Sequence, residues 1–494
     1  MKYKKSLFII SVILCVVLLA ACADTPPEQT EQPDYVFYDS AEDVSGRRQL
    51  FLDTQLIDEE KTTAEAVLNS PVRGEEVILF NDPWQGNCCD YFTVFEDTDE
   101  KGVKFYRLYY IGRWIYSAEY PDVLRICYAY SYDGYNWEFP KLGLREVDGS
   151  KDNNVLLDDT DQLFDNFFVF KDTNPDCNPD ERYKALGEYY AYLGGPVELR
   201  AWTSPDGIHW TCKGTVLPNG TGTFDSLNTC YYDAELNKYV MYSRNMYYTT
   251  DGLPYRSIQR SESEDFYNWS TPVYLTYADG QYMQMYTNNI SRYYRAPEYY
   301  IGYPTRYTSP DESPTGADRV TDSIFMFSRD GYSFNRTSET WILNRPEDDI
   351  NWTYGDSYFA AGIVQTKDAF GNDVMSFYTN EDRFSETGTK FVKYDLRLDG
   401  FMSYNALGKS AQVQTKPIKF SEGSLSLNYR AGVSGKVVVS LEDKNGNTLL
   451  ESTLTGDFTD KVVFDETQLE PFRNKGLVLK IQLHDAQVYS YIFD

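Results

Sequence analysis

Four stretches of the sequence share one pattern: SYDGYNW at 131–137, SPDGIHW at 204–210, SEDFYNW at 263–269 and SRDGYSF at 328–334, with a shorter copy, RLDGF, at 397–401. In each, Ser or a substitute ends an expected strand, Asp-Gly or its equivalent forms a tight turn, and an aromatic residue begins the next strand. The spacing of the copies is about the length of one four-stranded propeller blade. The sequence therefore predicts five repeats of one β unit.

The same order of expected strands precedes every turn. In the first repeat these strands are DYFTVFED at 90–97, FYRLYYIG at 105–112 and RICYAYS at 125–131. Five such units closed into a ring would leave no exposed sheet edge. We therefore expect an all-β fold with a five-bladed β-propeller over residues 46–401. A repetitive β-sandwich with coincidental turns is the alternative.

The repeat pattern ends after Phe401. Residues 402–494 contain segments of alternating apolar and polar residues, such as GKVVVSLEDKNGN at 435–447, with Asn445-Gly446 at an expected hairpin. This alternation is typical of antiparallel strands that have one buried face. We expect a small β-sandwich here.

The start of the chain indicates export. Residues 1–21 combine a lysine-rich beginning with an apolar stretch and read as a signal peptide. The stretch ends in Leu19-Ala20-Ala21-Cys22, which resembles the lipobox of bacterial lipoproteins and implies lipid on Cys22. Residues 22–45, rich in Pro, Glu and Thr at their start, are expected to form a flexible tether. The predicted location is the extracytoplasmic side of the membrane, held by a lipid anchor.

Composition excludes several functions. The formal net charge of −29 disfavours a nucleic-acid partner, because phosphate contacts need clustered Lys and Arg. The 44 tyrosines and 28 phenylalanines favour half-buried strands. His209 and His484 are the only histidines, which leaves very few candidates for a Ser-His-Asp triad or a multi-histidine metal site. Acid–base chemistry would therefore fall to carboxylates.

One loop, Asp172–Asp180, places oxygen-bearing side chains at alternate positions, as calcium loops do. It lacks the Gly and the Glu that an EF-hand needs at its sixth and twelfth positions. We expect a solvated loop and no cofactor, with calcium in another geometry as the alternative.

Several motifs together resemble the five-bladed-propeller glycoside hydrolases, the superfamily of fructan-cleaving and arabinan-cleaving enzymes. They are Asp82–Gly86 (DPWQG), the SxDGxxW turns, Phe224–Asn228 (FDSLN), Tyr286–Arg306 and the C-terminal TKPIKF…YSYIF. The resemblance covers nearly all of the chain after residue 34 and is closest to an uncharacterised bacterial group. It implies a propeller followed by a sandwich, and a carbohydrate substrate. The first-blade motif of the fructan-cleaving enzymes survives only as Asn81-Asp82-Pro83, and their RDP and EC motifs have no counterpart here.

The related enzymes take three acids from the first three blades. By position, the resemblance implies Asp90 as nucleophile or base, Asp165 as transition-state stabiliser and Asp225 as acid. Asp82 is an alternative to Asp90, and Glu381 is an alternative to Asp225. Carboxyl groups crowded at the mouth of the propeller's axial funnel can differ in pKa. Glycoside cleavage needs one protonated and one ionised carboxyl, and such a difference supplies both. A structural role for any one of these aspartates is an equally weighted alternative.

Further residues on the expected inner or second strands could hydrogen-bond or stack on sugar. The candidates are Trp84, Trp114, Asn166, Asn228, Arg244, Tyr286, Asn288, Arg295, Arg306, Asp322, Trp352 and Asp356. The turn aspartates Asp133, Asp206, Asp265 and Asp330 are expected to be structural. Two functions remain open: a surface glycoside hydrolase, and a carbohydrate-binding lipoprotein without catalysis. Two carboxylates suitably spaced across one pocket would favour the enzyme.

Overall fold

The computed structural model describes residues 35–115, 117–159, 164–190, 192, 194–250, 252–309, 319–342 and 355–494. Within these ranges the chain is built almost wholly of β-strands, with one short α-helix, α1 (Glu466–Leu469), and the 3₁₀ turns η1 (Pro179–Glu181) and η2 (Glu470–Phe472). None of the helices in this part of the chain is long and apolar enough to cross a membrane. The signal peptide and Cys22 lie outside the described residues.

Five sheets follow one another along residues 72–397. In the first three, the strands pair in chain order. The first sheet holds β5 (Cys88–Thr98), β6 (Lys104–Arg113), β7 (Arg125–Ser131) and β8 (Trp137–Glu138), with β9 (Val155–Asp158) also on β7. The second holds β10 (Phe164–Lys171), β11 (Tyr183–Tyr190), β12 (Val197–Ser204) and β13 (Thr211–Leu217). The third holds β14 (Thr229–Asp233), β15 (Lys238–Tyr248), β16 (Pro254–Ser263) and β17 (Val273–Tyr274).

The fourth and fifth sheets depart from simple chain order. The fourth holds β20 (Ile290–Tyr293), β21 (Ala296–Gly302), β24 (Met326–Ser328), β25 (Ser333–Arg336) and β18 (Thr276–Tyr277). A small sheet of β19 (Gln284–Met285), β22 (Thr305–Thr308) and β23 (Val320–Ser323) accompanies it. The fifth holds β26 (Val364–Lys367), β27 (Asp373–Glu381), β28 (Thr389–Arg397) and the much earlier strand β4 (Val72–Phe80). Strand β4 therefore ties the beginning of the repeat region to its end.

The repeated turns have the geometry that their sequence predicts. In the first copy Ser131 Oγ accepts the Gly134 N–H at 2.9 Å, and Asp133 Oδ1 accepts the N–H groups of Tyr135 and Asn136, each at 2.8 Å. Gly134 has φ +79°, a conformation that glycine adopts without strain. Asp206, Asp265 and Asp330 accept the same backbone bonds in their own copies, so the structural role expected for the turn aspartates is confirmed.

Tyrosines join three of the turns to a neighbouring sheet. The hydroxyl of Tyr109, in the first sheet, donates to the Gly207 carbonyl in the second at 2.9 Å. Tyr378 of the fifth sheet makes the same bond to Gly134 of the first, also at 2.9 Å. Tyr242 of the third sheet donates to the turn of the fourth, at Gly331, at 3.1 Å. A buried hydroxyl needs such a partner, and the turn carbonyl supplies one in each of these three cases.

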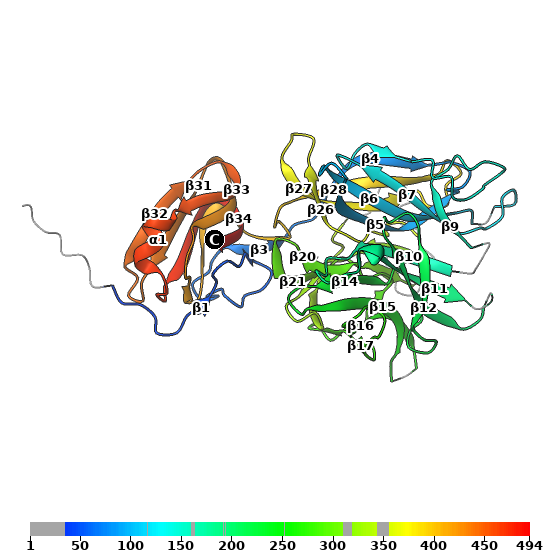
Figure 1. The fold of residues 1–494 in the computed structure, drawn as a ribbon. Helices are drawn as coiled ribbons and strands as arrows, with labels where there is room; N and C mark the ends of the chain where they lie inside the picture. The colour runs from blue at the N-terminus through cyan, green and yellow to red at the C-terminus, as the bar shows by residue number, and fades with distance from the viewer. Residues whose placement is uncertain are drawn as a thin grey trace, which may run out of the picture.

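The remaining strands form a separate seven-stranded sheet at the other end of the molecule (Figure 1). Its order is β3 (Glu65–Leu68), β29 (Met402–Gln414), β34 (Val478–Phe493), β31 (Leu425–Glu442) and β32 (Thr448–Leu454). Strands β2 (Gln49–Leu50) and β33 (Asp457–Phe464) pair with β34 and β31, while β1 (Glu42–Asp43) pairs with β30 (Ile418–Lys419). An apolar cluster, including Leu427, Val439 and Leu483, fills its core.

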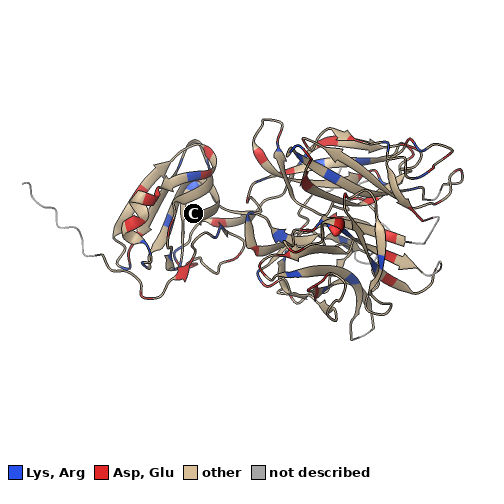
Figure 2. Cartoon of the chain, viewed as in Figure 1, with Lys and Arg blue, Asp and Glu red and all other residues tan. Residues whose placement is uncertain are grey.

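The segment before the first repeat belongs with this C-terminal sheet. Strands β1, β2 and β3 lie within residues 42–68, and all three pair with strands beyond residue 401. From the sequence, residues 42–45 are expected in the tether and residues 46–68 in the propeller. The segment carries no copy of the repeat, and the partners of its short strands all lie beyond residue 401. Acidic and basic residues are interspersed along the chain in both parts of the molecule (Figure 2).

Candidate functional site

Two of the predicted acids sit at matching irregularities in their sheets. Asp90, on β5, and Asp165, on β10, each stand where the register with the next strand shifts, as in a β-bulge. The residue after each, Tyr91 and Asn166, has a left-handed φ, of +49° and +53°. A β-bulge changes the direction in which a side chain points, and strained backbone of this kind is common at functional sites. Asn289 and Ser357 repeat this φ in the fourth and fifth repeats.

Asp90 is buried and paired with arginine. Its side chain is 3 % exposed and forms an ion pair with Nη2 of Arg383, which is 9 % exposed. Burial raises the pKa of Asp90, while the positive charges of Arg383 and Arg113 oppose that rise. A buried carboxyl held by an arginine is fixed in position and shielded from water.

Asp165 stands opposite Glu188 in the second sheet. The two residues are paired in the antiparallel register of β10 and β11, and Asn166 Nδ2 donates to Glu188 Oε2 at 2.8 Å. Burial, opposed by Arg113, raises the pKa of Asp165 to about 7. Burial, reinforced by the charges of Asp165 and Asp225, raises the pKa of Glu188 to about 9. Near neutral pH this pair of carboxyls therefore keeps at least one proton.

Asp225 has a different environment. Its side chain is 53 % exposed, and Oδ2 lies 3.0 Å from Nη1 of Arg244, which is 7 % exposed. Asp225 comes four residues before β14 and next to Phe224, whose φ is +38°. The adjacent guanidinium compensates a negative charge on this carboxyl. Asp225 is therefore accessible to a ligand and is held beside the positive charge of Arg244.

The four carboxyls of Asp90, Asp165, Glu188 and Asp225, here named the acid cluster, interact electrostatically. The charge of Asp225 raises the pKa of each of the other three. Nη1 of Arg113 lies 3.7 Å from Oδ2 of Asp165, and its charge also lowers the pKa of Asp90. Residues from the first three repeats and from the fifth thus meet in one place.

Aromatic rings adjoin the acid cluster. Tyr286 lies between Tyr358, at 5.3 Å between ring centroids, and Arg244, whose guanidinium carbon is 5.2 Å from its ring. Tyr358 stacks on Tyr91 at 5.7 Å. Asp90 and Asp225 both raise the pKa of Tyr91 electrostatically, in addition to burial. Amphipathic rings of this kind can contact the apolar faces of a ligand while leaving its polar edge to the acids.

The two alternative acids lie elsewhere. Glu381 accepts a bidentate pair from Arg73, at 2.9 and 2.8 Å, and the Tyr394 hydroxyl at 2.9 Å. Asp82 is half-buried, which raises its pKa, and its backbone is hydrogen-bonded to Gln85 and Gly86 in its own turn. The structure brings neither carboxyl into contact with the acid cluster.

Most of the other predicted ligand-binding residues hold the fold together. Asn228 binds the Phe224 and Ser226 carbonyls, Asn288 binds those of Leu227 and Tyr242, and Trp84 donates to Asn154. Arg306 is paired with Asp322, and Arg295 with Asp399 and Asp460. Asp356 is buried, which raises its pKa to about 7, and accepts the Arg383 backbone N–H at 2.9 Å. Trp352 lies outside the described residues. Asn166, Arg244 and Tyr286 are the members of this group that contact the acid cluster or its aromatic neighbours.

Sequence reasoning missed Glu188, Arg113 and Arg383. Each lies at or just beyond the end of the second strand in its repeat, β11, β6 and β27. An antiparallel second strand ends beside the start of the first, so its last residues reach the acids. The signal was a charged residue near the end of the second strand of a repeat, as Glu188 is in YKALGEYY at 183–190.

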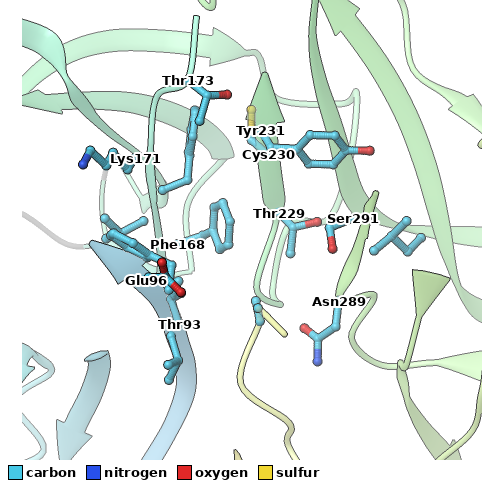
Figure 3. Close-up of a pocket in the computed structure, with 17 residues that line it drawn as sticks. Thr93, Glu96, Phe168, Lys171, Thr173, Thr229, Cys230, Tyr231, Asn289 and Ser291 are labelled. Atoms are coloured by element: carbon cyan, nitrogen blue, oxygen red, sulfur yellow. The ribbon is translucent and has the colours of Figure 1, made fainter. Parts of the chain in front are cut away.

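A separate cavity of about 280 Å³ lies further along the same first strands (Figure 3). Its walls include Thr93 of β5, Phe168 of β10, Thr229 of β14, Ser291 of β20 and Ala361. Strands from four sheets and the segment before β26 therefore surround one space. Among the described residues that line it, none belongs to the acid cluster, and the charged ones are Glu96 and Lys171.

The loop at Asp172–Asp180 uses its oxygens for bonds within the protein. Asp172 lies 2.7 Å from Lys184 Nζ and accepts the Tyr239 hydroxyl at 2.7 Å. Asn174 and Asn178 accept backbone N–H groups of the loop, from Asp176 and Asp180. These contacts account for the alternating polar residues as the bonds of a folded loop.

Comparisons with known proteins identify no family for this chain. No protein family matches the sequence, and no curated protein matches it. Solved structures with a similar trace include an N-acetylgalactosamine deacetylase from F. plautii in complex with blood group B trisaccharide. Its identity is 12 % and its TM-score 0.45, over 85 % of this chain and 95 % of that one.

Glycoside hydrolases are also among the similar structures. A family 43 arabinoxylan arabinofuranohydrolase from Bacillus subtilis has 10 % identity and a TM-score of 0.41, over 86 % of this chain and 99 % of that one. A glycosyl hydrolase from Bacteroides ovatus has 14 % identity and a TM-score of 0.43, over 67 % and 94 %. At these values the similarities do not identify an activity, which has to be argued from the residues of this chain.

Proposed function

We propose that this protein is a glycoside hydrolase whose reaction is carried out by Asp165 and Asp225. The observation that carries the proposal is the contrast between two accessible carboxyls in one cluster. Asp165, 22 % exposed, has its pKa raised by burial to about 7, whereas Asp225, 53 % exposed, is paired with Arg244. Glycoside cleavage needs this division between a protonated and an ionised carboxyl.

In this mechanism Asp165 donates its proton to the glycosidic oxygen as the bond to the anomeric carbon breaks. Asp225 supplies the negative charge on the other side. It either takes a proton from the attacking water or bonds to the anomeric carbon until water releases it. Positional resemblance implies other roles, with Asp225 as acid, Asp165 as transition-state stabiliser and Asp90 as nucleophile or base. The arginine beside Asp225 and the raised pKa of Asp165 favour the roles proposed here.

The two buried acids support this pair. Glu188, opposite Asp165, is protonated at neutral pH and so adds no charge that would drive the proton from its neighbour. Asp90 holds Arg383, and the two charges largely balance within the cluster. Both carboxyls are nearly inaccessible, which suits positioning better than attack on a sugar.

We further propose that the five sheets are blades of one β-propeller, that the C-terminal sheet forms a sandwich, and that lipid on Cys22 holds the protein outside the cytoplasmic membrane. The tyrosine bonds between neighbouring sheets, the pairing of β4 with β28 and the shared cavity support the ring. Closure of the last sheet by an early strand is a common way to complete such a ring.

The test is a glycan-library screen of the lipid-free protein, scored for both bound glycan and released sugar. Wild type is compared with Asp165→Asn and Asp225→Asn, and with Asp148→Asn on an exposed loop as the matched control. Release of sugar by wild type and the control, lost in both cluster variants, supports the hydrolase. Glycan binding by wild type, with no sugar released by wild type or by the control, would reject it in favour of a carbohydrate-binding protein.

A further inference from the structure

A second hollow, rich in tyrosine, lies between the third and fourth sheets. It encloses about 330 Å³ and is lined by Tyr247, Tyr255, Tyr274, Tyr282 and Arg256, among others, and is here named the tyrosine groove. Tyr282 stacks with Tyr247 at 5.7 Å and with Tyr255 at 5.3 Å between centroids. Tyr247 remains 37 % exposed and Tyr282 55 % exposed. Stacked rings are thus kept at the surface rather than buried in the core.

The tyrosine groove lies at the same end of the sheets as the acid cluster. Strand β15 runs antiparallel to β14, so its last residues lie beside the chain that leads into β14, where Asp225 is found. Arg244, the partner of Asp225, and Tyr247 are three residues apart on β15. An extended strand advances about 3.3 Å per residue, so their α-carbons are roughly 10 Å apart.

One side chain physically connects the two places. Arg256 lines the tyrosine groove, and its guanidinium carbon lies 5.3 Å from the ring centroid of Tyr286 beside the acid cluster. The same side chain donates to Gln284 at 2.6 Å. Tyr282, in the groove, and Tyr286 are four residues apart, which limits their separation to about 14 Å. A ligand a few sugar residues long could therefore reach both places.

The chemistry of the groove fits sugar rings. A tyrosine presents a flat apolar face and a polar hydroxyl edge. A pyranose presents C–H groups on its faces and hydroxyls around its rim, so the two stack with their polar edges together. Lipid or apolar peptide would leave the hydroxyls and the Arg256 guanidinium desolvated without new partners.

We propose that the tyrosine groove binds the distal sugar residues of a glycan chain whose other end lies at the acid cluster. The proposal rests on the proposed function and narrows it: the substrate is an oligosaccharide or polysaccharide rather than a single glycoside. The tyrosines increase the affinity for longer glycans, whereas the carboxyls of the acid cluster act on the glycosidic bond.

The test uses Tyr247→Ala and Tyr282→Ala, with Tyr248→Ala as the matched control. Tyr248 is 64 % exposed on the same strand and does not line the groove. The probes are a printed array of oligosaccharides graded from one to six residues and a panel of 4-nitrophenyl monosaccharides. Melting temperatures show whether each variant folds, and Asp225→Asn is measured in parallel as a binding-competent, inactive form.

We expect each groove variant to bind the longer glycans about fivefold to tenfold more weakly, as loss of one aromatic contact predicts. The Tyr248 variant should bind like wild type, and monosaccharide probes should not distinguish any of them. Equal binding of all lengths by wild type and the groove variants would overturn the groove while leaving hydrolysis intact. Length-dependent binding without sugar release would reject the hydrolase and keep the groove.

Discussion

Asp165 of β10 and Glu188 of β11 are direct partners across an antiparallel pair of strands, with Asn166 bonded to the second carboxyl. Like charges at directly opposed positions are unfavourable, and burial of both groups adds to the cost of ionising them. The pKa values of about 7 and about 9 follow from this arrangement. The pair gives the protein a proton source at neutral pH without a histidine.

Activity should decline on the alkaline side of neutrality. If Asp165 is the proton donor, it acts only when protonated, and its pKa of about 7 limits the active fraction above that pH. We expect kcat/KM to fall about tenfold per pH unit well above pH 7. The measurement is a pH–rate profile on the substrate found by screening. A flat profile between pH 7 and pH 9 would assign the acid to another residue.

Replacing Asp225 by Asn should abolish turnover while preserving the fold. The side chain is half exposed and keeps its size and a hydrogen-bond acceptor for Arg244, so the melting temperature should change little. Loss of the ionised carboxyl should lower kcat at least about 100-fold. Asp148→Asn removes the same charge from an exposed loop and should retain full activity. Turnover within tenfold of wild type would remove Asp225 from the mechanism.

Glu188→Gln should stabilise the protein at high pH and leave it unchanged at low pH. The pKa of Glu188 is about 9 in the folded protein and about 4.5 when unfolded, so the native state binds the extra proton. Wild-type stability from this group therefore falls as pH rises from about 4.5 to 9. Glutamine does not titrate, so at pH 8, about 3.5 pH units above the unfolded pKa, the variant should gain up to about 5 kcal/mol.

Guanidinium unfolding at pH 4 and pH 8 measures this difference for wild type and Glu188→Gln. Asp148→Asn, on an exposed loop, is the comparison at both pH values. If the difference in stability between wild type and Glu188→Gln is the same at both pH values, the pKa of Glu188 is not raised in the folded protein. The environment assigned to Asp165 would then also be wrong.

Glu381→Gln should lower stability with no specific effect on catalysis. The carboxylate holds Arg73 through two bonds and accepts the Tyr394 hydroxyl, and it is 8 % exposed. Breaking one side of a largely buried pair should cost about 1–3 kcal/mol, less than for a fully buried pair because Arg73 is 22 % exposed. Turnover per folded molecule should stay within about twofold. A 100-fold loss of kcat in folded protein would restore Glu381 as a candidate acid.

Cys22→Ser should release the protein from the membrane fraction, because the sulfur is the proposed site of lipid attachment. Fractionation of cells that express wild type or the variant measures this directly. A truncated form that begins at residue 35 serves as the reference without the anchor. Equal partitioning of wild type and Cys22→Ser would mean that another feature holds the protein at the membrane.

The sequence by itself determined the repeat and its turns. Ser, Asp and Gly at fixed spacing specify hydrogen bonds between near neighbours, as Ser131, Asp133 and Gly134 show, so a local pattern was enough. Alternation of side chains likewise identified the strands around residues 435–441. Asp90, Asp165 and Asp225 were predicted from their positions near the start of the first strand of a repeat, with roles that the resemblance implies.

Only the tertiary structure decided which groups surround those acids. Glu188 reaches Asp165 through strand register, and Arg383 reaches Asp90 across nearly 300 residues, distances that no local pattern encodes. Whether a carboxyl holds a proton depends on its burial and on the charges that face it, and both arise only when the sheets assemble. The pairing of residues 42–68 with the C-terminal sheet was hidden for the same reason, because a short strand is defined by the partner it meets.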